Sequence, residues 1–363
     1  FYENRQGKQD ITIELPDGST LTTKDVQGYL DDCVANSGYK LVEKYQDLWS
    51  YTNRFTVNDY DYTKDGGFNW VENDANVNPE SMFAIKYNEY ANYNEELKGY
   101  ANMYVLYFGI RDDHDQATFP FMRGWGYGPV SPALVREWKM AEPDDPRRDA
   151  SICYVPSELP DYDRAEGWED WVQETDYINK KLTPIGGKAN DGTIKLFSHL
   201  MYDNDAWTVN DKDINCTQDL VLLRYADVLL MRSELYEDAD KGMNEVRQRV
   251  GLPSVSYSLE ALQNERRWEF AFEGLRYNDI RRWGQGGGQS NGYTEEVLSK
   301  QQNEAIYFGG QPDLNVAHNG GYVERYKATR GFFKIPESEI LKSDGVLMQN
   351  EGWGSEGLYM GWK

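Results

Sequence analysis

The feature that most constrains this chain is a block of apolar residues at helical spacing in its last third. Between residues 219 and 231 the apolar positions occupy much of the circumference of a predicted helix: Leu220, Val221, Leu223, Ala226, Val228, Leu229 and Leu230. A helix with so little polar surface has to be packed among other elements. The chain is therefore expected to build a helical core around this segment.

Two shorter helices carry clear start and stop signals. Residues Thr22 to Val34 have a threonine cap and Asp25 in the first turn, and Gly38 follows as the stop. Residues 243–250 are followed by a glycine and then a proline, which is the usual order at the end of a helix. The second segment is predicted to form a helical hairpin with the apolar helix, whereas 22–34 belongs to a separate N-terminal helical part.

A further helix is predicted to start at the cap Ser258 and to run as far as the glycines at 284–288. Its apolar side chains lie on one stripe: Trp268, Ala271, Phe272 and Leu275. Beyond it, the short apolar segment 332–336 predicts a strand.

The chain between Trp49 and about Tyr162 lacks a clear periodicity and is rich in Asn, Asp, Gly and Tyr. Brief apolar stretches interrupt it at 82–85 and 103–110. Loops on a rigid scaffold often carry binding residues, so a ligand site is expected here. The predicted organisation is one domain with three parts: a helical part at 1–48, a loop-rich ligand-binding insert at 49–218, and a C-terminal region at 219–363.

Charge excludes several classes of partner. The chain carries 38 Lys and Arg against 61 Asp and Glu, a net charge of −23, which repels nucleic acid and anionic lipid. Its longest apolar runs are about four residues, far from the roughly 18 that a membrane-spanning helix needs. The three cysteines, Cys33, Cys153 and Cys216, form no CxxC pair, and we expect buried free thiols.

Aromatic residues make up 14% of this otherwise polar chain. Tyrosine and tryptophan offer rigid apolar faces with polar edges, which suit sugar rings as well as protein interfaces. The candidate ligand-binding residues are the aromatic residues of the insert that have Asn and Asp neighbours: Trp70, Tyr107, Phe108, Trp125 and Tyr127. Any one of them can equally serve to pack the insert.

Catalytic and metal-binding motifs are missing from the sequence. It contains no G-x-S-x-G elbow, H-E-x-x-H motif or phosphate-binding loop, and His114, His199 and His318 stand apart. Asp59, Asp61 and Asp65 suggest calcium only faintly, because their spacing fails the EF-hand pattern. We expect no cofactor and no catalytic activity. With 61 Asp and Glu in the chain, a pair of carboxylates for glycoside hydrolysis can always be proposed, so the number of acidic residues is no evidence for such an enzyme.

The segment 265–284 reads ERRWEFAFEGLRYNDIRRWG. It resembles, at every fixed position, the ERR-x-E-x-x-x-EG-x-R-x-x-D-x-RRWG pattern of the SusD/RagB family of outer-membrane nutrient-binding lipoproteins. LRYADVLLM at 223–231 and NEVRQRVGLP at 244–253 resemble the same family. Weaker matches at 37–41, 124–126, 145–148, 334–336 and 349–353 extend the resemblance over nearly the whole chain.

This resemblance implies a mainly α fold, with a SusD-like superhelical scaffold of tetratricopeptide-like helix pairs, a large loop-rich C-terminal region and minor β structure. Members are longer, so the chain would be a C-terminal part, with an export signal and a lipidated cysteine upstream of Phe1. The family's sugar-contacting aromatics lie shortly before the Asp-Pro-Arg stretch, which points to 107–127.

The implied function is non-catalytic capture of glycans at the cell surface and delivery to a SusC-like TonB-dependent transporter in the outer membrane. Peptide or protein-derived nutrient capture by a RagB-like subunit is the alternative, and a glycoside-active enzyme is the weakest hypothesis. The only membrane contact expected is through the upstream lipid anchor.

The charged residues and large ring of the signature are expected to be structural. They are Glu265, Arg266, Glu269, Glu273, Arg276, Asp279, Arg281, Arg282 and Trp283. Glu265, Glu269 and Glu273 recur every four residues, and acids and bases on a mostly buried helix are best explained as ion pairs. Loss of Glu269 or Arg276 is accordingly expected to lower stability.

Overall fold

A computed structural model describes residues 11–73, 77–88, 102–110, 116–127, 129–162, 175–203, 215–286, 289–303, 306–307, 311–312 and 321–353. The chain divides into two compact units, Gln9–Arg276 and Tyr277–Lys363, the latter together with Phe1–Lys8. This division falls inside the signature segment, where neither composition nor periodicity changes.

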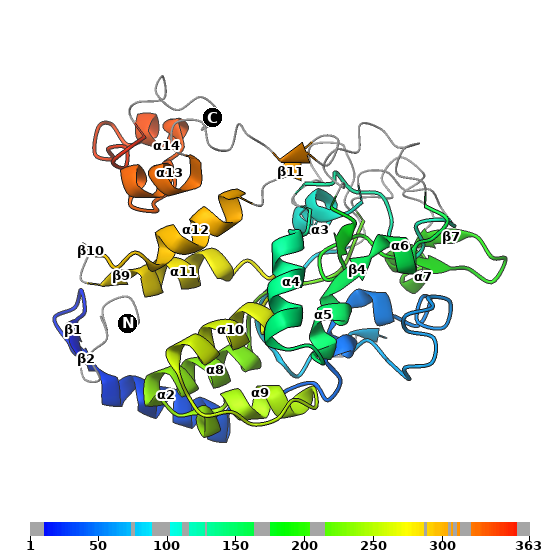
Figure 1. The fold of residues 1–363 in the computed structure, drawn as a ribbon, viewed down its shortest axis with the longest axis horizontal. Coiled ribbons are helices and arrows are strands. Elements are labelled where there is room, and N and C mark those ends of the chain that lie inside the picture. The colour runs from blue at the N-terminus through cyan, green and yellow to red at the C-terminus, as the bar shows by residue number, and fades with distance from the viewer. Residues whose placement is uncertain are drawn as a thin grey trace. The chain divides into compact units, whose positions relative to one another are not determined.

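Four helices of the larger unit lie side by side: α2 (Thr23–Asn36), α8 (Tyr225–Tyr236), α9 (Met243–Arg249) and α10 (Leu259–Glu269) (Figure 1). The predicted signals at the start of α2 are confirmed, because Thr22 and Asp25 form a reciprocal capping box. Gly38 follows with a φ of +80°. Ser258 caps α10 by accepting a hydrogen bond from the Ala261 amide at 3.0 Å.

The predicted apolar helix begins later than its sequence pattern indicates. Residues Leu220–Arg224 form strand β8, which pairs antiparallel with β3 (Ser81–Ile85). Helix α8 starts only at Tyr225, and Ala226, Leu229 and Leu230 in it are fully buried, as predicted for the core. The helical prediction for 220–224 was wrong because pairing with a distant strand decided the local conformation.

The predicted long helix after Ser258 is in fact two helices. Helix α10 ends at Glu269, and Phe272 and Gly274 then adopt φ values of +69° and +81°, which interrupt the helix. Helix α11 (Arg276–Gly284) begins after this turn. A positive φ at phenylalanine is unusual, so the stripe of apolar residues gave no sign of the break.

The insert contains more regular structure than predicted. Its elements are short: η1 (Tyr45–Leu48), η2 (Ser50–Thr52), α3 (Met103–Phe108), α4 (Pro132–Ala141), α5 (Pro146–Ser151), β4 (Ile152–Tyr154), α6 (Val155–Glu158), β5 (Tyr177–Asn179), β6 (Gly186–Lys188), β7 (Ile194–Leu196) and α7 (Phe197–Met201). The strands pair as antiparallel β4–β5 and β6–β7. Ser131 and Asp145 cap α4 and α5, and each helix then starts with proline, a signal that was readable in the sequence.

Aromatic rings fill much of the core of the insert. Tyr51, Tyr60 and Phe121 pack edge to face with centroids about 6 Å apart. The buried ammonium group of Lys180 lies 3.5 Å from the ring centroid of Tyr62 and also pairs with Glu158. Many aromatics of this polar chain therefore pack the interior. The thiols of Cys153 and Cys216 are free and buried, as predicted, whereas Cys33 is half-buried.

The remaining elements of the larger unit are the hairpin β1 (Thr12–Glu14) and β2 (Thr20–Thr22), and the turn η7 (Ala239–Lys241). The smaller unit contains α11, α12 (Tyr293–Asn303), α13 (Gly321–Thr329) and α14 (Glu337–Lys342). Two very short hairpins accompany them, β9 (Gln285–Gly286) with β10 (Gln289–Ser290), and β11 (Ile306–Tyr307) with β12 (Gln311–Pro312). Ile280, Leu298 and Tyr326 form its core.

The strand predicted at 332–336 does not form; the segment is irregular, and Phe332 and Phe333 are exposed. Among the helices in the described part of the chain, none has the length and apolar composition to cross a bilayer.

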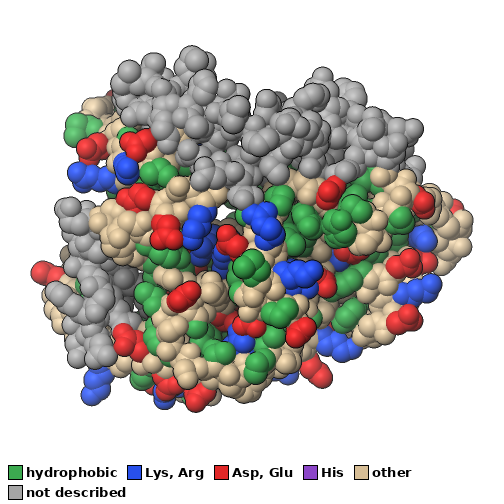
Figure 2. Space-filling model, viewed as in Figure 1, with side chains coloured by type: hydrophobic (Ala, Val, Ile, Leu, Met, Phe, Trp, Pro, Cys, Tyr) green, Lys and Arg blue, Asp and Glu red, His purple; other side chains and the backbone are tan. Residues whose placement is uncertain are grey.

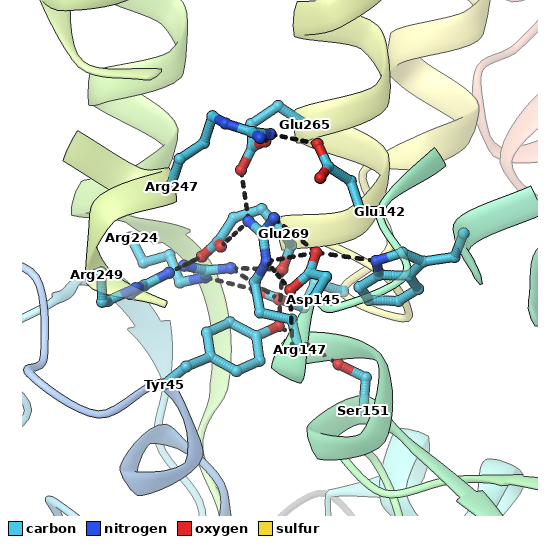
Figure 3. A network of polar contacts seen from close by, with 12 residues as sticks. Tyr45, Glu142, Asp145, Arg147, Ser151, Arg224, Arg247, Arg249, Glu265 and Glu269 are labelled. Carbon is cyan, nitrogen blue, oxygen red and sulfur yellow. Dashed lines mark hydrogen bonds and ion pairs between the residues drawn. The ribbon is translucent and has the colours of Figure 1, made fainter. Parts of the chain in front are cut away.

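A buried ion-pair network joins the insert to the helical core (Figure 3). Five carboxylates and five cations, whose side chains are at most 9% exposed, take part: Glu80, Asp145, Glu265, Glu269, Glu273, Arg147, Lys181, Arg224, Arg247 and Arg249. Burying a charge costs several kcal/mol unless it is paired and hydrogen-bonded, so the members depend on one another.

Glu269 occupies the centre of this network. Its carboxylate accepts hydrogen bonds from Arg224 at 2.5 Å, from Arg147 at 2.9 Å, and from Arg249. Glu265, one turn earlier on α10, binds Arg147, and Glu273, just beyond the end of α10, binds Arg224. The predicted structural role of the glutamates agrees with this geometry, but their partners come from distant segments.

The signature's own arginines make other contacts. Arg266 pairs with Asp227. On α11, Arg282 pairs with Asp279 at 2.9 Å. Arg281 lies over the ring of Phe332, and Trp283 packs edge to face against Tyr293. Arg276 is half-buried at the start of α11.

Replacing Glu269 by alanine is expected to lower the free energy of unfolding by about 3–5 kcal/mol, because it leaves three buried arginines short of a partner. Glu137→Ala is the matched control: it breaks a pair with Arg267 in which the side chains are 40% and 22% exposed, and should cost less than about 1 kcal/mol. Urea unfolding of both variants measures the difference. Equal losses would show that the network contributes no more than a surface pair.

The buried carboxylates of the network should also make the free energy of unfolding fall at acidic pH. Burial alone would raise the pKa of the Glu269 carboxyl, but Arg249, Arg224 and Arg147 hold this pKa well below its usual range. A depressed carboxyl pKa stabilises the fold above the unfolded-state value of about 4.3, and this contribution is lost as the pH falls through the folded-state pKa. The free energy of unfolding should therefore decrease below about pH 5. In Glu269→Gln the decrease should be smaller, and an unchanged pH dependence would contradict this assignment.

Candidate functional site

Three of the predicted aromatic residues lie together where α3 meets the segment 121–127. The ring centroids of Tyr107 and Trp125 are 5.1 Å apart, those of Trp125 and Tyr127 are 6.0 Å apart, and those of Tyr107 and Tyr127 are 6.2 Å apart. We call these three residues the aromatic platform. Aromatic residues 18 and 20 positions apart in sequence thus form one cluster.

Main-chain hydrogen bonds hold the platform in place. The amides of Trp125 and Tyr127 donate to the carbonyls of Leu106 and Tyr107, both at 2.8 Å. The chain can come this close because Gly109 and Gly124 face each other: a Cβ on Gly124 would lie 2.6 Å from the Cα of Gly109. The backbone, rather than side-chain packing alone, therefore fixes where the rings stand.

The start of α3 is anchored to the rest of the larger unit. Asn102 caps the helix by accepting hydrogen bonds from the amides of Tyr104 and Val105, and its side-chain amide donates to the carbonyl of Gln218 at 2.8 Å. Gln218 in turn accepts a hydrogen bond from Ser50 at 2.7 Å and donates one to the carbonyl of Lys181 at 2.6 Å. Buried hydrogen bonds through Asn102 and Gln218 therefore fix the start of α3, the helix that carries Tyr107.

The platform rings are partly accessible. Tyr127 is 49% exposed, while Tyr107 and Trp125 are half-buried, and Trp125 packs against Leu106. Rings that are seated on one side and open on the other can stack on the apolar C–H face of a sugar, and the tyrosine hydroxyls supply hydrogen bonds. The neighbours at 111–115 and 128 lie outside the described residues.

One exposed ring on α3, that of Tyr104, was not among the residues predicted from the sequence. Tyr104 is 49% exposed and its centroid lies 6.4 Å from that of Phe108, with the two planes tilted by 32°. Tyr104, Tyr107 and Phe108 have the i, i+3, i+4 spacing that places residues on one face of a helix. That spacing within Met103–Phe108 was the signal that could have identified Tyr104.

The other two predicted ligand contacts are placed differently. Trp70 is only 3% exposed and packs edge to face against Phe197, at 5.3 Å between centroids. Phe108 is half-buried and packs against the main core, with Tyr104 beside it. Trp70 therefore packs the interior and is too buried to stack on a sugar.

One half-buried carboxyl, that of Glu72, has a pKa raised as in many catalytic acids. Burial, with a smaller contribution from Asp219, raises the pKa of Glu72 to about 7. The cavity beside it, lined among others by Trp49, Trp70 and Asp219, measures only about 30 Å³, which is enough for a water molecule and not for a sugar ring. The raised pKa of Glu72 is thus a consequence of its burial rather than a sign of glycoside cleavage.

Metal ligands do not gather in the described part of the chain, where no group of three His, Cys, Asp or Glu side chains is placed to hold an ion. Asp59, from the segment that faintly suggests calcium, instead pairs with Lys188 at 3.5 Å. His199 is buried against Asn215, and His114 and His318 lie outside the described residues. On the face shown in Figure 2, acidic and basic side chains are interspersed.

Comparison with solved structures finds the same fold in surface glycan-binding proteins. A laminarin-binding SusD-like protein matches with a TM-score of 0.59 at 23% identity, covering 91% of this chain and 59% of its own. Surface glycan-binding protein A from Bacteroides thetaiotaomicron matches with a TM-score of 0.60 at 20% identity, covering 90% and 59%. The protein of that name from Bacteroides fluxus gives 0.60 at 21%, covering 91% and 58%.

At these identities the likeness establishes the fold, and the chain spans just under three-fifths of the length of these structures. The predicted SusD-like fold, mainly helical with minor β structure, is thereby confirmed. A search of curated proteins found no significant match. The model of the SusD family matches residues 17–353, nearly the whole sequence, and the chain therefore belongs to the SusD family.

Proposed function

We propose that the protein captures a glycan on its aromatic platform without cleaving it. The observation that carries this proposal is the cluster of Tyr107, Trp125 and Tyr127, whose partly open rings lie within 5.1–6.2 Å of one another on a backbone-bonded support. Such a cluster can present several rings to successive sugars of one glycan. Stacking of this kind requires no general acid and no nucleophile.

The fold relatives suggest the first ligand to test. One solved structure of surface glycan-binding protein A from Bacteroides thetaiotaomicron, with a TM-score of 0.58 at 20% identity, is a complex with laminarihexaose, and another relative is described as laminarin-binding. Those ligands belong to those proteins. They make β-glucan oligosaccharides the starting point of a panel that also includes other neutral glycans and peptides.

The expected affinity follows from the area that each ring can cover. A sugar that buries about 40–60 Å² of apolar surface gains about 1–1.5 kcal/mol at about 25 cal/mol per Å². Three rings together then give on the order of millimolar affinity, and additional contacts along a longer chain bring it towards micromolar. Binding should therefore strengthen as the oligosaccharide lengthens up to the span of the platform.

Family membership supports a wider role. In this proposal the full-length protein is lipid-anchored in the outer membrane at the cell surface, and it passes its glycan to a SusC-like TonB-dependent transporter. A platform of stacking rings suits capture and release, because it can hold a glycan and let it leave intact. Capture of peptides remains the alternative, and binding of peptides but no glycan in the panel would favour it.

Replacing Tyr127 by alanine is expected to weaken oligosaccharide binding about five- to tenfold, because one open stacking surface is lost. Trp125→Ala should weaken it at least as much. The matched control is Tyr29→Ala, which removes a 67%-exposed ring on α2, outside the platform, and should leave affinity unchanged. Isothermal titration calorimetry with each variant, after its melting temperature has been checked, measures the effect. Wild-type affinity in both folded platform variants would contradict the proposed site.

Affinity purification of the full-length protein from native outer membranes is expected to recover a TonB-dependent barrel, and mass spectrometry of the same material should find a lipid on its N-terminal cysteine. The partner and the anchor both follow from family membership, so they stand apart from the platform experiment. Recovery of unlipidated protein with no barrel would contradict this part of the proposal.

A further inference from the structure

A polar cavity of about 270 Å³ opens elsewhere in the larger unit, at the outer end of the ion-pair network. Its walls come from the end of α4, from α9, and from α10 with the loop before it. The residues that line it are Ala141, Glu142, Arg247, Val255, Ser258, Glu260, Ala261, Asn264, Glu265 and Trp268. Figure 3 shows Glu142, Arg247 and Glu265 at this end of the network. The cavity shares no residue with the aromatic platform.

Arg247 is a buried cation whose hydrogen-bonding capacity is only partly used. Its Nε donates to the carbonyl of Pro253 at 2.8 Å, and its Nη1 donates to Glu142 at 2.7 Å and to Glu265 at 2.9 Å. Its Nη2 has no hydrogen-bond partner among the described residues, although the side chain is only 5% exposed. A buried guanidinium with an open N–H pair is held rigidly by its other three bonds.

Trp268 contributes an aromatic ring to the wall. The ring is 1% exposed and stacks on Trp138 with centroids 5.0 Å apart and planes 15° apart. Its Nε1–H is buried with no hydrogen-bond partner within the described parts of the chain, whereas that of Trp138 donates to Asp145 at 2.9 Å. Because this nitrogen has almost no accessible surface, Trp268 closes the cavity as an aromatic wall and does not offer a donor to it.

The remaining lining groups supply acceptors. Glu142 uses only its Oε1 on Arg247, Glu260 is exposed, and Asn264 is half-buried with an amide that can both donate and accept. Three glutamates against one arginine give the lining a negative charge, which disfavours an anion. The positive charge and the open N–H pair of Arg247 disfavour a metal or ammonium ion. A neutral molecule whose groups both donate and accept satisfies both conditions.

We propose that this cavity binds one neutral polyhydroxyl unit, such as a single sugar residue. Each hydroxyl can accept from the N–H groups of Arg247 or Asn264 and donate to a carboxylate. Small-molecule sites start at about 300 Å³, so a cavity of 270 Å³ suits one ring rather than a chain. The inference goes beyond capture on the platform and does not rest on it.

The test follows the indole N–H signals of protein labelled with ¹⁵N-tryptophan during titration with glucose, galactose and xylose. The Trp268 signal, assigned through Trp268→Phe, should shift saturably with at least one of these sugars, at a dissociation constant on the order of 1 mM. Glucuronate, which carries a negative charge, should bind at least about tenfold more weakly to the same site.

Two variants locate the binding. Asn264→Ala removes an amide that has no hydrogen bond within the described residues, and should weaken the sugar about two- to tenfold. Ala261→Leu fills the cavity and should abolish the Trp268 shift. The matched control, Ala35→Leu, makes the same change on an exposed position of α2 and should behave as wild type. Tyr127→Ala should leave the Trp268 titration intact, which separates this site from the platform.

Three results would overturn the proposal. The first is a Trp268 signal that no neutral sugar moves, which would mean that the cavity holds only water. The second is a shift that survives in both Asn264→Ala and Ala261→Leu. The third is equal binding of glucuronate, which would show that neutrality is not selected. Loss of platform binding in Tyr127→Ala has no bearing on any of them.

Discussion

The buried pairing of Glu269 with arginines from three different segments is the interaction on which the rest of the larger unit depends. Arg147 comes from α5 in the insert, Arg224 ends β8, and Arg249 ends α9. None of these charges is tolerable in the interior without the others. The helical core and the irregular insert are thereby obliged to fold together, although their sequences look like separate regions.

This constraint reaches the aromatic platform through a short chain of contacts. The strand that ends in Arg224 is preceded by Gln218, whose carbonyl accepts the hydrogen bond from Asn102 at the start of α3. A loop-rich surface normally lacks such rigid support. The buried ion-pair network therefore supports the platform indirectly, through β8, Gln218 and Asn102. The proposed binding surface has a rigid support although its elements are short.

The sequence predicted what local chemistry decides and failed where distant contacts decide. The capping box of Thr22 with Asp25 and the cap at Ser258 involve residues three apart, so they were readable. The strand at 220–224 depends on pairing with Ser81–Ile85, and the break at Phe272 depends on a strained φ, neither of which leaves a periodic trace. The charge pattern of the signature indicated ion pairs but could not name partners more than a hundred residues away.

The same limit applies to the site. Residue type and position suggested Tyr107, Trp125 and Tyr127, yet they suggested Trp70 equally, because an aromatic ring in the core and one on the surface look alike in sequence.

Because main-chain hydrogen bonds and the facing pair Gly109 and Gly124 set the positions of the platform, the side chain of Tyr127, which is 49% exposed, contributes little to holding it together. In the proposed function, substitution at 127 alters which ligand is recognised while leaving the main-chain support unchanged. A change of ligand preference at this position therefore need not lower the stability of the fold. The same support marks the two glycines, rather than the rings, as the positions where evolution and protein engineers have least choice.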